Sequence, residues 1–456
     1  MPVVGQSSST DPSSNAGGCF VLIQIAPATT ISPADHKAAN SAALGILVRM
    51  SPRQQKVIHA AEAVLRPLVR FVDRFRTPRQ LSGEPKKILV LEYWNIGDIA
   101  MELPFLESLR LQYPAAHIAI LTSPKCSPLL RDQGLVDEII EVKVPWAQHY
   151  SRLAKYNPFT TLWFDFFRTL RVLRAKKFDL AFAARADLRE NFLLWLVNVT
   201  RRVAYSFRGG DFLLTDAVTP DLSRPHFSST WLRLLEHVGK SPVTTVPHWR
   251  LPAEEHEWAG NYLNDLGIGP DDFVVAINPG ARSPVRQWGE DRFRAVAKRL
   301  AADFPVKIVW FQDPGSPSAS GDNSQFATVS LPLRKFMAVL SRCQLSICND
   351  SGPMHLSAAL DVPVVGIFGP GEPLWWAPLG DGHRVVIRSE FWCRPCFDYC
   401  FFDQPYCLRL VSVDSVYDAA AGKVRELLVG AEVSNGLRVE QSARVKTLST
   451  VEGAAD

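Results

Sequence analysis

Short apolar runs alternate with amphipathic stretches over most of the chain, and this order predicts strands that are each followed by a helix. The first strand is expected at Lys87–Tyr93, with a helix reaching about Gln112, and further strands at His117–Thr122 and Glu138–Val142. Because a helical crossover separates successive strands, the strands are expected to run parallel in one sheet. The pattern predicts an α/β domain over residues 85–240.

The same alternation resumes after a linker at Lys240–Leu251. Apolar strands are expected at Phe273–Asn278 and Val306–Phe311, and a strand–turn–helix–strand unit occupies residues 345–368. These elements predict a second α/β domain over residues 252–430. Two similar domains joined by a linker leave a cleft between them, which is where ligands prefer to bind.

The two ends of the chain lack this periodicity. Residues 1–50 are rich in Ser, Ala, Thr and Pro, and residues 431–456 are mostly polar. Segments of this kind cannot bury enough apolar surface to offset the entropy that folding costs. We therefore expect a disordered extension at the start and a flexible tail at the end.

A basic amphipathic helix is expected within residues 51–84. Ser51 can cap it, Pro52 suits its first position, and Pro67 should kink or split it. Apolar residues recur at steps of three and four and form one stripe, made of Ile58, Ala61, Leu65, Leu68, Val72 and Phe75. Such a helix can lie on an anionic membrane, which would make the protein peripheral on the inner face of the cytoplasmic membrane. The alternative is a helix packed on the body of the protein.

The composition is that of an ordinary globular protein. At 456 residues the chain is long enough for roughly two domains. The net charge of +4 is too small to indicate binding to nucleic acid. No apolar run reaches the roughly 18 residues of a membrane-spanning helix, and no signal-sequence pattern is seen. We therefore expect a cytoplasmic location.

Three polar loops follow predicted strands, and function in parallel sheets gathers at the carboxyl ends of strands. The first loop holds Asn95, Gly97 and Asp98, and Gly97 permits the close approach of a ligand. Asp98 lies at a helix start, where a carboxylate stays ionised and can accept a proton from an attacking hydroxyl. The alternative is that Asp98 only stabilises the start of the helix.

The second loop carries Gly280, Ala281, Arg282 and Arg286. Arginine is well suited to bind phosphate oxygens through its paired donors. The loop is therefore a candidate for binding an anionic ligand. The alternative is a solvated loop with ordinary surface arginines.

The third loop runs from Asp350 through Ser351 and Gly352 to His355, between a strand and a helix. Free N–H groups and the positive helix end meet at such a turn, so it suits an anion such as a diphosphate. Asp350 and His355 could hydrogen-bond sugar hydroxyls beside it. The alternative is an Asp350 that caps the helix and a His355 that packs on it.

Four cysteines cluster in the second domain, at Cys393, Cys396, Cys400 and Cys407. Four thiolates complete a tetrahedron, so the cluster is a candidate structural zinc or iron site. Cytosolic cysteine clusters favour metal over disulfides. Buried free thiols and a local disulfide are the alternatives.

An aromatic and basic segment lies between the first domain's strands, at Trp146–Phe167. It could line the site of an anionic, lipid-linked glycan. The alternative is a helical hairpin under which the aromatic rings pack, because aromatic side chains tend to be buried.

In their order along the chain, these motifs resemble those of the ADP-heptose:lipopolysaccharide heptosyltransferases of glycosyltransferase family 9. The resemblance covers about residues 86–430, and the cysteine loop looks like one found in the second-heptose transferases. Arg286 stands where the family usually has lysine. The matching motifs are Gly97-Asp98, Asn278-Pro279-Gly280-Ala281, Arg286-Gln287-Trp288, Asp350-Ser351-Gly352-Pro353-Met354-His355 and Phe368-Gly369-Pro370.

The resemblance implies a GT-B fold, in which two Rossmann-like domains with parallel sheets face a central cleft. It implies an inverting enzyme, with no cofactor required for catalysis, that moves a heptose from ADP-heptose to a lipopolysaccharide inner-core acceptor. The partners would be an ADP-sugar donor and a lipid-linked glycan. Asp98 would be the general base, and Arg286 would neutralise the leaving diphosphate. The donor would contact Gly280, Ala281, Arg282, Asp350, Ser351, Gly352 and His355, and the acceptor would contact Asn95 and Gly97.

Other functions stay open from the sequence. The same fold could use another nucleotide-sugar or a protein acceptor. A non-catalytic protein that binds a metal or a nucleotide-sugar is an alternative of a different class. A dinucleotide-dependent enzyme is disfavoured, because no G-x-G-x-x-G follows the first strand.

Overall fold

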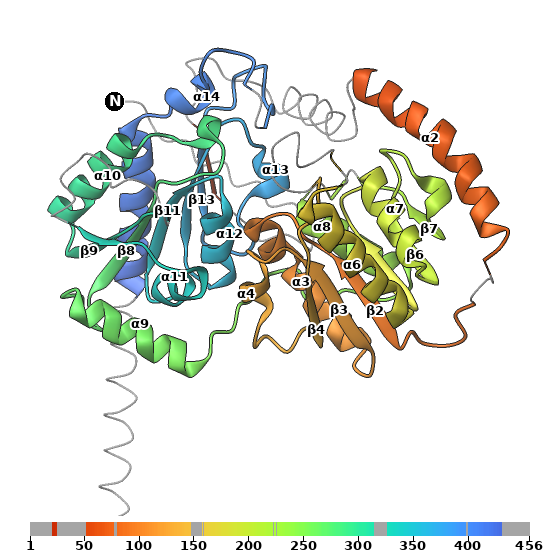
Figure 1. The fold of residues 1–456 in the computed structure, drawn as a ribbon. Coiled ribbons are helices and arrows are strands. Elements are labelled where there is room, and N and C mark those ends of the chain that lie inside the picture. Colours follow the sequence, from red (N-terminus) through yellow and green to blue (C-terminus); the bar gives the residue numbers. More distant parts are fainter. Residues whose placement is uncertain are drawn as a thin grey trace, which may run out of the picture.

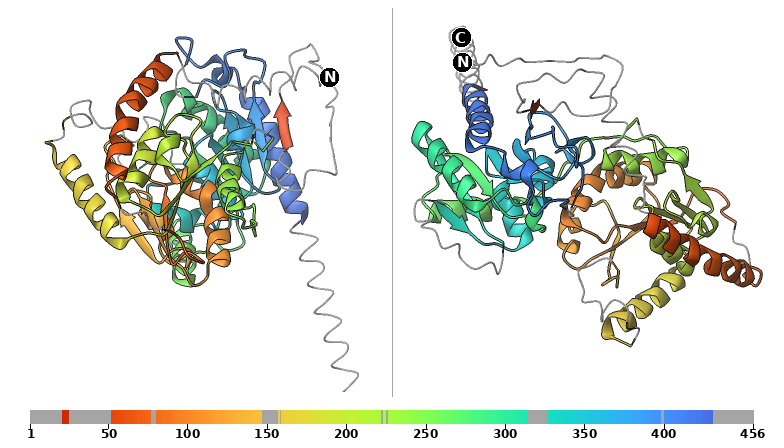
Figure 2. Two further views of the ribbon diagram at one scale, coloured as in Figure 1. Left: turned by 90° about the vertical axis from the view of Figure 1, so that its right-hand side faces the viewer. Right: turned by 90° about the horizontal axis from the view of Figure 1, so that it is seen from above.

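The chain folds into two α/β domains that lie side by side (Figure 1). The structure is a computed structural model, and it describes residues 21–24, 52–76, 80–146, 157, 159–221, 223–224, 226–313, 326–397 and 400–430. Each domain has one sheet whose strands all run parallel, and helices pack against it (Figures 1 and 2). The predicted fold class, two Rossmann-like domains of the GT-B type, is confirmed.

The N-terminal domain is built on a six-stranded sheet with the order β4-β3-β2-β5-β6-β7. Its strands are β2 (Lys87–Leu91), β3 (His117–Thr122), β4 (Glu138–Glu141), β5 (Leu180–Ala183), β6 (Arg201–Tyr205) and β7 (Asp216–Val218). Its helices are α3 (Ile96–Gln112), α4 (Ser127–Leu130), α6 (Thr161–Lys176), α7 (Leu188–Val197), η1 (Asp211–Leu213) and α8 (Phe227–His237). The order places the loop after β2 near the middle of the sheet, facing the second domain.

The C-terminal domain is built on a seven-stranded sheet with the order β1-β13-β12-β11-β8-β9-β10. Its strands are β1 (Val21–Gln24), β8 (Phe273–Asn278), β9 (Val306–Phe311), β10 (Ala327–Val329), β11 (Leu345–Asn349), β12 (Val364–Phe368) and β13 (Arg384–Ile387). Its helices are α9 (Ala253–Asp265), η2 (Pro284–Arg286), α10 (Glu290–Asp303), α11 (Leu333–Leu340), α12 (Gly352–Ala359), α13 (Pro373–Trp376) and α14 (Tyr406–Arg409), and residues 413–430 are also helical. The central strands β8 and β11 are neighbours, so the two loops that were predicted to bind an anion lie next to each other.

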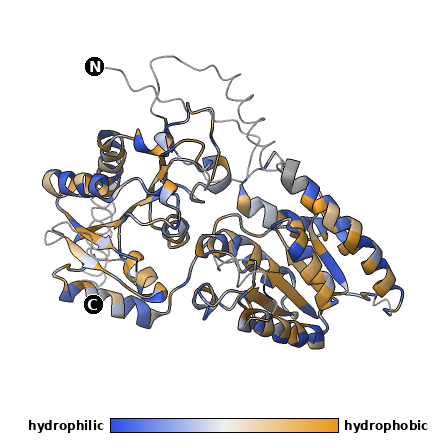
Figure 3. Cartoon of the chain, turned by 45° about the horizontal axis from the view of Figure 1, so that its top comes forward, coloured by the Kyte–Doolittle hydropathy of each residue, from blue (hydrophilic) through white to orange (hydrophobic). Residues whose placement is uncertain are grey.

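The central strands are apolar throughout because helices cover both of their faces. Ile88, Leu89, Val90 and Leu91 of β2 are all fully buried. Figure 3 shows the strands of this sheet coloured largely as hydrophobic, whereas the helices carry both colours. Continuous apolar runs therefore marked these strands correctly.

The elements at the far edge of the first sheet were missed. β6 begins with two arginines, and the side chain of Arg201 pairs with Asp216 of β7 at 2.8 Å. Charged residues are tolerated there because edge strands are partly exposed. The apolar-run criterion therefore does not detect β6 and β7.

The N-terminal extension was expected to be disordered throughout, and this is wrong for one short stretch. Val21–Gln24 forms β1, which pairs in parallel with β13 along the edge of the second sheet (Figure 2). An edge strand offers unpaired backbone groups that another segment can complete. The other residues of 1–50 and the tail from 431 lie outside the described residues.

The predicted amphipathic helix is α2 (Pro52–Asp73), which lies along the outer side of the N-terminal domain next to α7 (Figures 1 and 2). Pro67 does not split it, because the helix is continuous on both sides of this residue. Val69 is buried against Trp195 and Leu213. The packing alternative is therefore right for one face of α2. Within the described ranges no helix is long and apolar enough to cross a membrane.

The two domains meet where the first turns of α3 and α12 touch. A Cβ atom on Gly97 would lie 2.9 Å from Cδ2 of His355, which is closer than real Cβ contacts come. The backbone N–H of Trp249, in the linker, also donates to the carbonyl oxygen of Ala359 at 2.6 Å. Glycine at position 97 therefore permits the approach of the two helix starts.

Candidate active site

A cavity of about 840 Å³ opens between the two domains. The loop between β2 and α3 forms one wall, and the loops after β8 and β11 form the opposite wall. The structure brings together every residue predicted to act on donor or acceptor: Asn95, Gly97, Asp98, Gly280, Ala281, Arg282, Arg286, Asp350, Ser351, Gly352 and His355. Their roles stay predictions, but their common location is a property of the fold.

Asp98 lies in the first turn of α3 and is only 8% exposed. The side-chain amide of Asn95 donates to Oδ2 of Asp98 at 3.0 Å, and Arg185 forms an ion pair with the same oxygen. The helix start adds a positive partial charge. The carboxylate is therefore held in one orientation at the cavity wall.

The loop after β8 faces Asp98 with two arginines. Nη1 of Arg282 donates to Oδ1 of Asn95 at 2.9 Å, so this hydrogen bond crosses between the domains. Nη1 of Arg286 lies 3.3 Å from Oδ2 of Asp350. These contacts hold both guanidinium groups at the cavity, where they can meet phosphate oxygens.

Asn349 joins the two loops of this wall, and the sequence analysis did not identify it. Its Nδ2 donates to the carbonyl oxygen of Pro279 at 2.7 Å, and its Oδ1 accepts from the N–H of Trp288 at 3.1 Å. Trp288 is itself fully buried. The amide of Asn349 therefore fixes the loop after β8 relative to the loop after β11.

The start of α12 is open to the cavity. Ser351 is the N-cap residue, and its side chain makes no capping hydrogen bond. Pro353 has no N–H and that of Met354 donates to the carbonyl oxygen of Ser351, so the N–H of Gly352 is the candidate donor to an anion in this turn. The predicted capping alternative is not what the structure shows, because the cap residue is Ser351 and not Asp350.

His355 follows in the first turn of α12 and is almost completely buried. Burial, with His226 and Arg286 nearby, lowers its pKa to about 3, although Asp98 acts in the opposite direction. His226 precedes α8, and burial lowers its pKa to about 4. Both rings are therefore neutral near pH 7, and each can offer one donor and one acceptor.

Further wall residues were missed by the sequence analysis, and Arg185 is the main one. It follows β5 directly, at the carboxyl end of a central strand. The rule that identified the other loops applies there too, so this position carried a signal that was not used. Phe227, at the start of α8, lies on the same wall.

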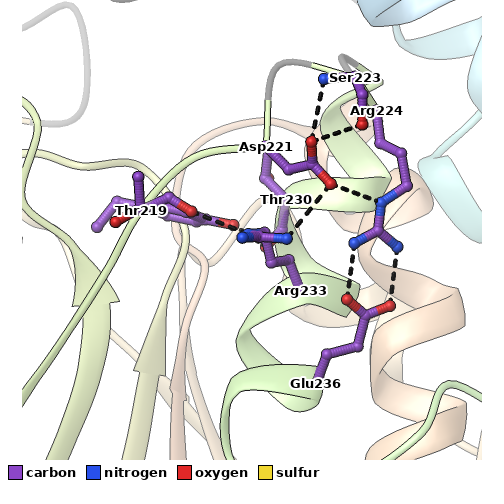
Figure 4. A network of polar contacts seen from close by, with 8 residues as sticks. Thr219, Asp221, Ser223, Arg224, Thr230, Arg233 and Glu236 are labelled. Atoms are coloured by element: carbon purple, nitrogen blue, oxygen red, sulfur yellow. Dashed lines mark hydrogen bonds and ion pairs between the residues drawn. The ribbon is translucent and has the colours of Figure 1, made fainter.

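A network of ion pairs and hydrogen bonds fixes the loop that precedes α8 (Figure 4). Arg224 donates to both carboxylate oxygens of Glu236, at 2.8 and 2.7 Å, and to Asp221 at 3.0 Å. Arg233 contacts Asp221 at 3.3 Å, and Ser223 donates to it as well. Hydrogen bonds from Ser223 and Arg224 lower the pKa of Asp221 to about 2. The network keeps the start of α8 in place beside the cavity.

The aromatic segment does not line the cavity as far as the described residues go. Trp146 packs on Trp163 and Phe166, with ring centroids 6.3 and 5.2 Å apart. The helical packing alternative is therefore right for these rings. Residues 147–156 and 158 lie outside the described residues.

The four clustered cysteines lie beside the cavity, which their loop reaches through Phe397. All four are free thiols, so the local disulfide is wrong. Burial, with the neighbouring cysteines, raises the pKa of Cys396 to about 11 and that of Cys407 to about 12. Among the residues placed by the structure, no group of three or more His, Cys, Asp or Glu side chains is arranged to hold a metal ion. The metal site stays a prediction.

Curated relatives match most of this sequence. Lipopolysaccharide heptosyltransferase 2 of Salmonella typhimurium is 24% identical over 318 residues, which is 66% of this chain and 87% of that protein. Lipopolysaccharide heptosyltransferase 3 of Escherichia coli is 24% identical over 312 residues, which is 65% of this chain and 86% of that protein.

Solved structures agree in fold. A family 9 glycosyl transferase from Veillonella parvula superposes with a TM-score of 0.60 at 21% identity, covering 75% of this chain and 97% of that one. ADP-heptose lps heptosyltransferase II of E. coli superposes with a TM-score of 0.58 at 20% identity, covering 76% and 99%.

The sequence pattern of one family spans more than half of the chain, over residues 166–406. This match includes the loops after β8 and β11 and ends within the cysteine loop. A non-catalytic binding protein is therefore no longer favoured. The chain belongs to glycosyltransferase family 9 (heptosyltransferase) and is a glycosyltransferase.

Proposed function

We propose that this enzyme transfers a heptose from ADP-heptose to a lipopolysaccharide inner-core acceptor, with inversion at the transferred carbon. The observation that carries the proposal is the opposition of two kinds of group across one cavity. Asp98 stands on the N-terminal wall, and the arginines with the open start of α12 stand on the other. Relatives named as lipopolysaccharide heptosyltransferases support the choice of donor and acceptor.

On the acceptor side, Asp98 acts as the general base. Its carboxylate takes the proton of an acceptor hydroxyl while that oxygen attacks the anomeric carbon of the heptose. The bond from this carbon to the diphosphate breaks on the opposite face, so the configuration inverts and ADP leaves. The carbon passes through an oxocarbenium-like state, by analogy with glycoside hydrolysis.

On the donor side, positively charged groups bind the leaving diphosphate. Arg286 stays oriented through Asp350, and the first turn of α12 lines the same cavity. Arginine in place of the family's usual lysine offers two parallel donors to phosphate oxygens. Donors of this kind contribute about 3 kcal/mol each to barrier lowering in oxyanion holes. This charge stabilises the leaving group within the protein, so the proposed reaction requires no cofactor.

The role of Asp98 is tested by replacing it with asparagine. Asp98→Asn should lower kcat by about 10²- to 10⁴-fold, because the neutral amide cannot accept the hydroxyl proton. Binding of ADP, measured by the shift of the melting temperature, should persist. Asp165→Asn, an exposed position on α6, is the matched control and should transfer at the wild-type rate. Wild-type turnover in Asp98→Asn would exclude it as the base.

The donor is tested by a thermal-shift comparison of ADP, GDP and UDP with the full chain. ADP should raise the melting temperature most, since a ligand at 100 times its Kd stabilises the native state by about 2.7 kcal/mol. Arg286→Ala should lose the shift. Arg294→Ala, whose arginine pairs with Glu290 on α10, should keep it. A larger shift with GDP or UDP would point to another nucleotide-sugar.

We also propose that α2 contacts an anionic membrane, where a lipid-linked glycan would be found. Its inner face is occupied, since Arg66 pairs with Asp211 and Glu62 accepts from the N–H of Gly210. Its outer face is apolar and exposed, and Phe71 and Phe75 are 63% and 74% exposed. The exposed apolar residues are Val57, Val64, Leu68, Phe71 and Phe75. Arg70 and Arg74 are exposed near them and would attract anionic lipids.

Liposome flotation of the full chain tests this contact. The wild type should float with anionic vesicles and less with neutral ones. Val64→Ser/Leu68→Ser/Phe71→Ser should float at least several-fold less, because apolar insertion contributes about 25 cal/mol for each Å² buried. Val243→Ser/Leu266→Ser/Val429→Ser, which changes exposed apolar residues elsewhere, is the matched control. Equal flotation of the two triple variants would remove α2 from the membrane contact.

We further propose that the cysteine loop binds a structural metal. The neighbouring cysteines contribute to the raised pKa values of Cys396 and Cys407, which supports the proximity of the four thiols. Four protein ligands would leave no open position, so the role would be structural. Elemental analysis of the full chain should find about one zinc or iron per chain, given four thiolate ligands. Cys396→Ser/Cys407→Ser should lose it, whereas the buried and remote Cys343→Ser should retain it. A metal-free wild type would end this proposal.

A further inference from the structure

A cluster of buried charges surrounds Asp98 on the side away from the donor loops. Glu92, Glu102 and Glu190 are each completely buried, and they come from the end of β2, from α3 and from α7. Arg185 lies among them and also reaches the cavity wall. Burying three carboxyl groups is costly unless they are hydrogen-bonded, paired with a cation or kept protonated.

Two aromatic rings hold the guanidinium group of Arg185. Its Cζ lies 5.1 Å from the ring centre of Trp94 and 5.0 Å from that of Phe227. Trp94 is itself fixed, because its Nε1 donates to Glu190 at 2.7 Å and its backbone N–H donates to Glu92 at 3.0 Å. Two of the buried carboxyl groups thus orient the ring against which Arg185 packs.

Among these buried groups, Arg185 and Asp98 form the ion pair, because the pKa values of the three glutamates are raised. Burial raises the pKa of Glu92 to about 8 and that of Glu190 to about 7, and it raises that of Glu102 well above its usual value. Burial alone lowers the pKa of Arg185, but Asp98, Glu92 and Glu190 raise it overall. Arg185 therefore stays cationic, and Asp98 is the carboxylate that it contacts directly.

We propose that Arg185 is a positioning residue for the general base, an inference that rests on the proposed function. Its guanidinium group holds one oxygen of Asp98 and leaves the other for the acceptor hydroxyl. Asn95 donates to the same oxygen as Arg185, so both fixed donors lie on one side of the carboxylate. Glu92 and Glu190 act through Trp94 and keep Arg185 in this place.

Arg185→Gln should lower kcat about 100-fold, as loss of one preorganised donor does, with the KM for ADP-heptose changed by no more than about threefold.

Rescue separates positioning from structure. Arg185→Lys keeps the charge and should recover part of kcat. Methylguanidinium in millimolar amounts should restore turnover in Arg185→Gly. Arg189→Gln is the matched control, because Arg189 follows in the same segment but pairs with Asp187 outside the cavity. It should retain kcat within about twofold, as expected for a site away from the chemistry.

Unchanged kcat in Arg185→Gln would overturn the inference. So would a loss of kcat with no rescue by lysine or methylguanidinium, since that marks a purely structural role. If Arg185→Gln does not fold, the test is the kcat of Arg185→Lys, which should be intermediate. The wild type keeps the two proposals distinct: if it neither binds ADP nor transfers heptose, the proposed function fails, whatever Arg185 does.

Discussion

The site depends on one close contact between the domains, where Gly97 of α3 lies against His355 of α12. A side chain at position 97 would meet the histidine ring at 2.9 Å, so the approach of the two helix starts requires glycine. This contact brings the amino ends of two helices to the same cavity. The first turns of both helices therefore line the cavity, where their positive ends favour an anion.

The cavity holds its charges in pairs. Asp98 pairs with Arg185 on one wall, and Asp350 pairs with Arg286 on the other. Each pair fixes a group to which a role is proposed, the base on one side and the phosphate-binding arginine on the other. The groups are thus oriented before any substrate arrives, and preorganisation of this kind is a major source of catalytic power. Arg282 of one wall donates to Asn95 of the other, and Asn95 in turn donates to Asp98, so one amide both joins the walls and orients the Asp98 carboxylate.

The sequence predicted the structure best where one physical rule governs many residues at once. Continuous apolar runs identified the central strands, because both faces of a parallel sheet are covered. Loops at the carboxyl ends of those strands then contained Asp98, Arg286 and Asp350. The same rule points to Arg185 after β5, and there the signal was present but was not used. α2 shows the opposite difficulty: its inner and outer faces are both apolar, so periodicity alone does not say which one is buried.

The sequence by itself determined the fold class and the order of the loops that follow the strands. It also determined which residue types are available for acid–base chemistry and for binding the phosphates of a sugar donor. These properties follow from local patterns, because hydrophobic periodicity, turn residues and helix starts each depend on residues only a few positions apart. Only the tertiary structure decided that Asp98 shares a cavity with Asp350, and that Arg185 and Asn95 hold its carboxylate. It also decided that Val21–Gln24 completes the second sheet. Contacts between residues far apart in sequence depend on how the two domains close, which no local pattern encodes.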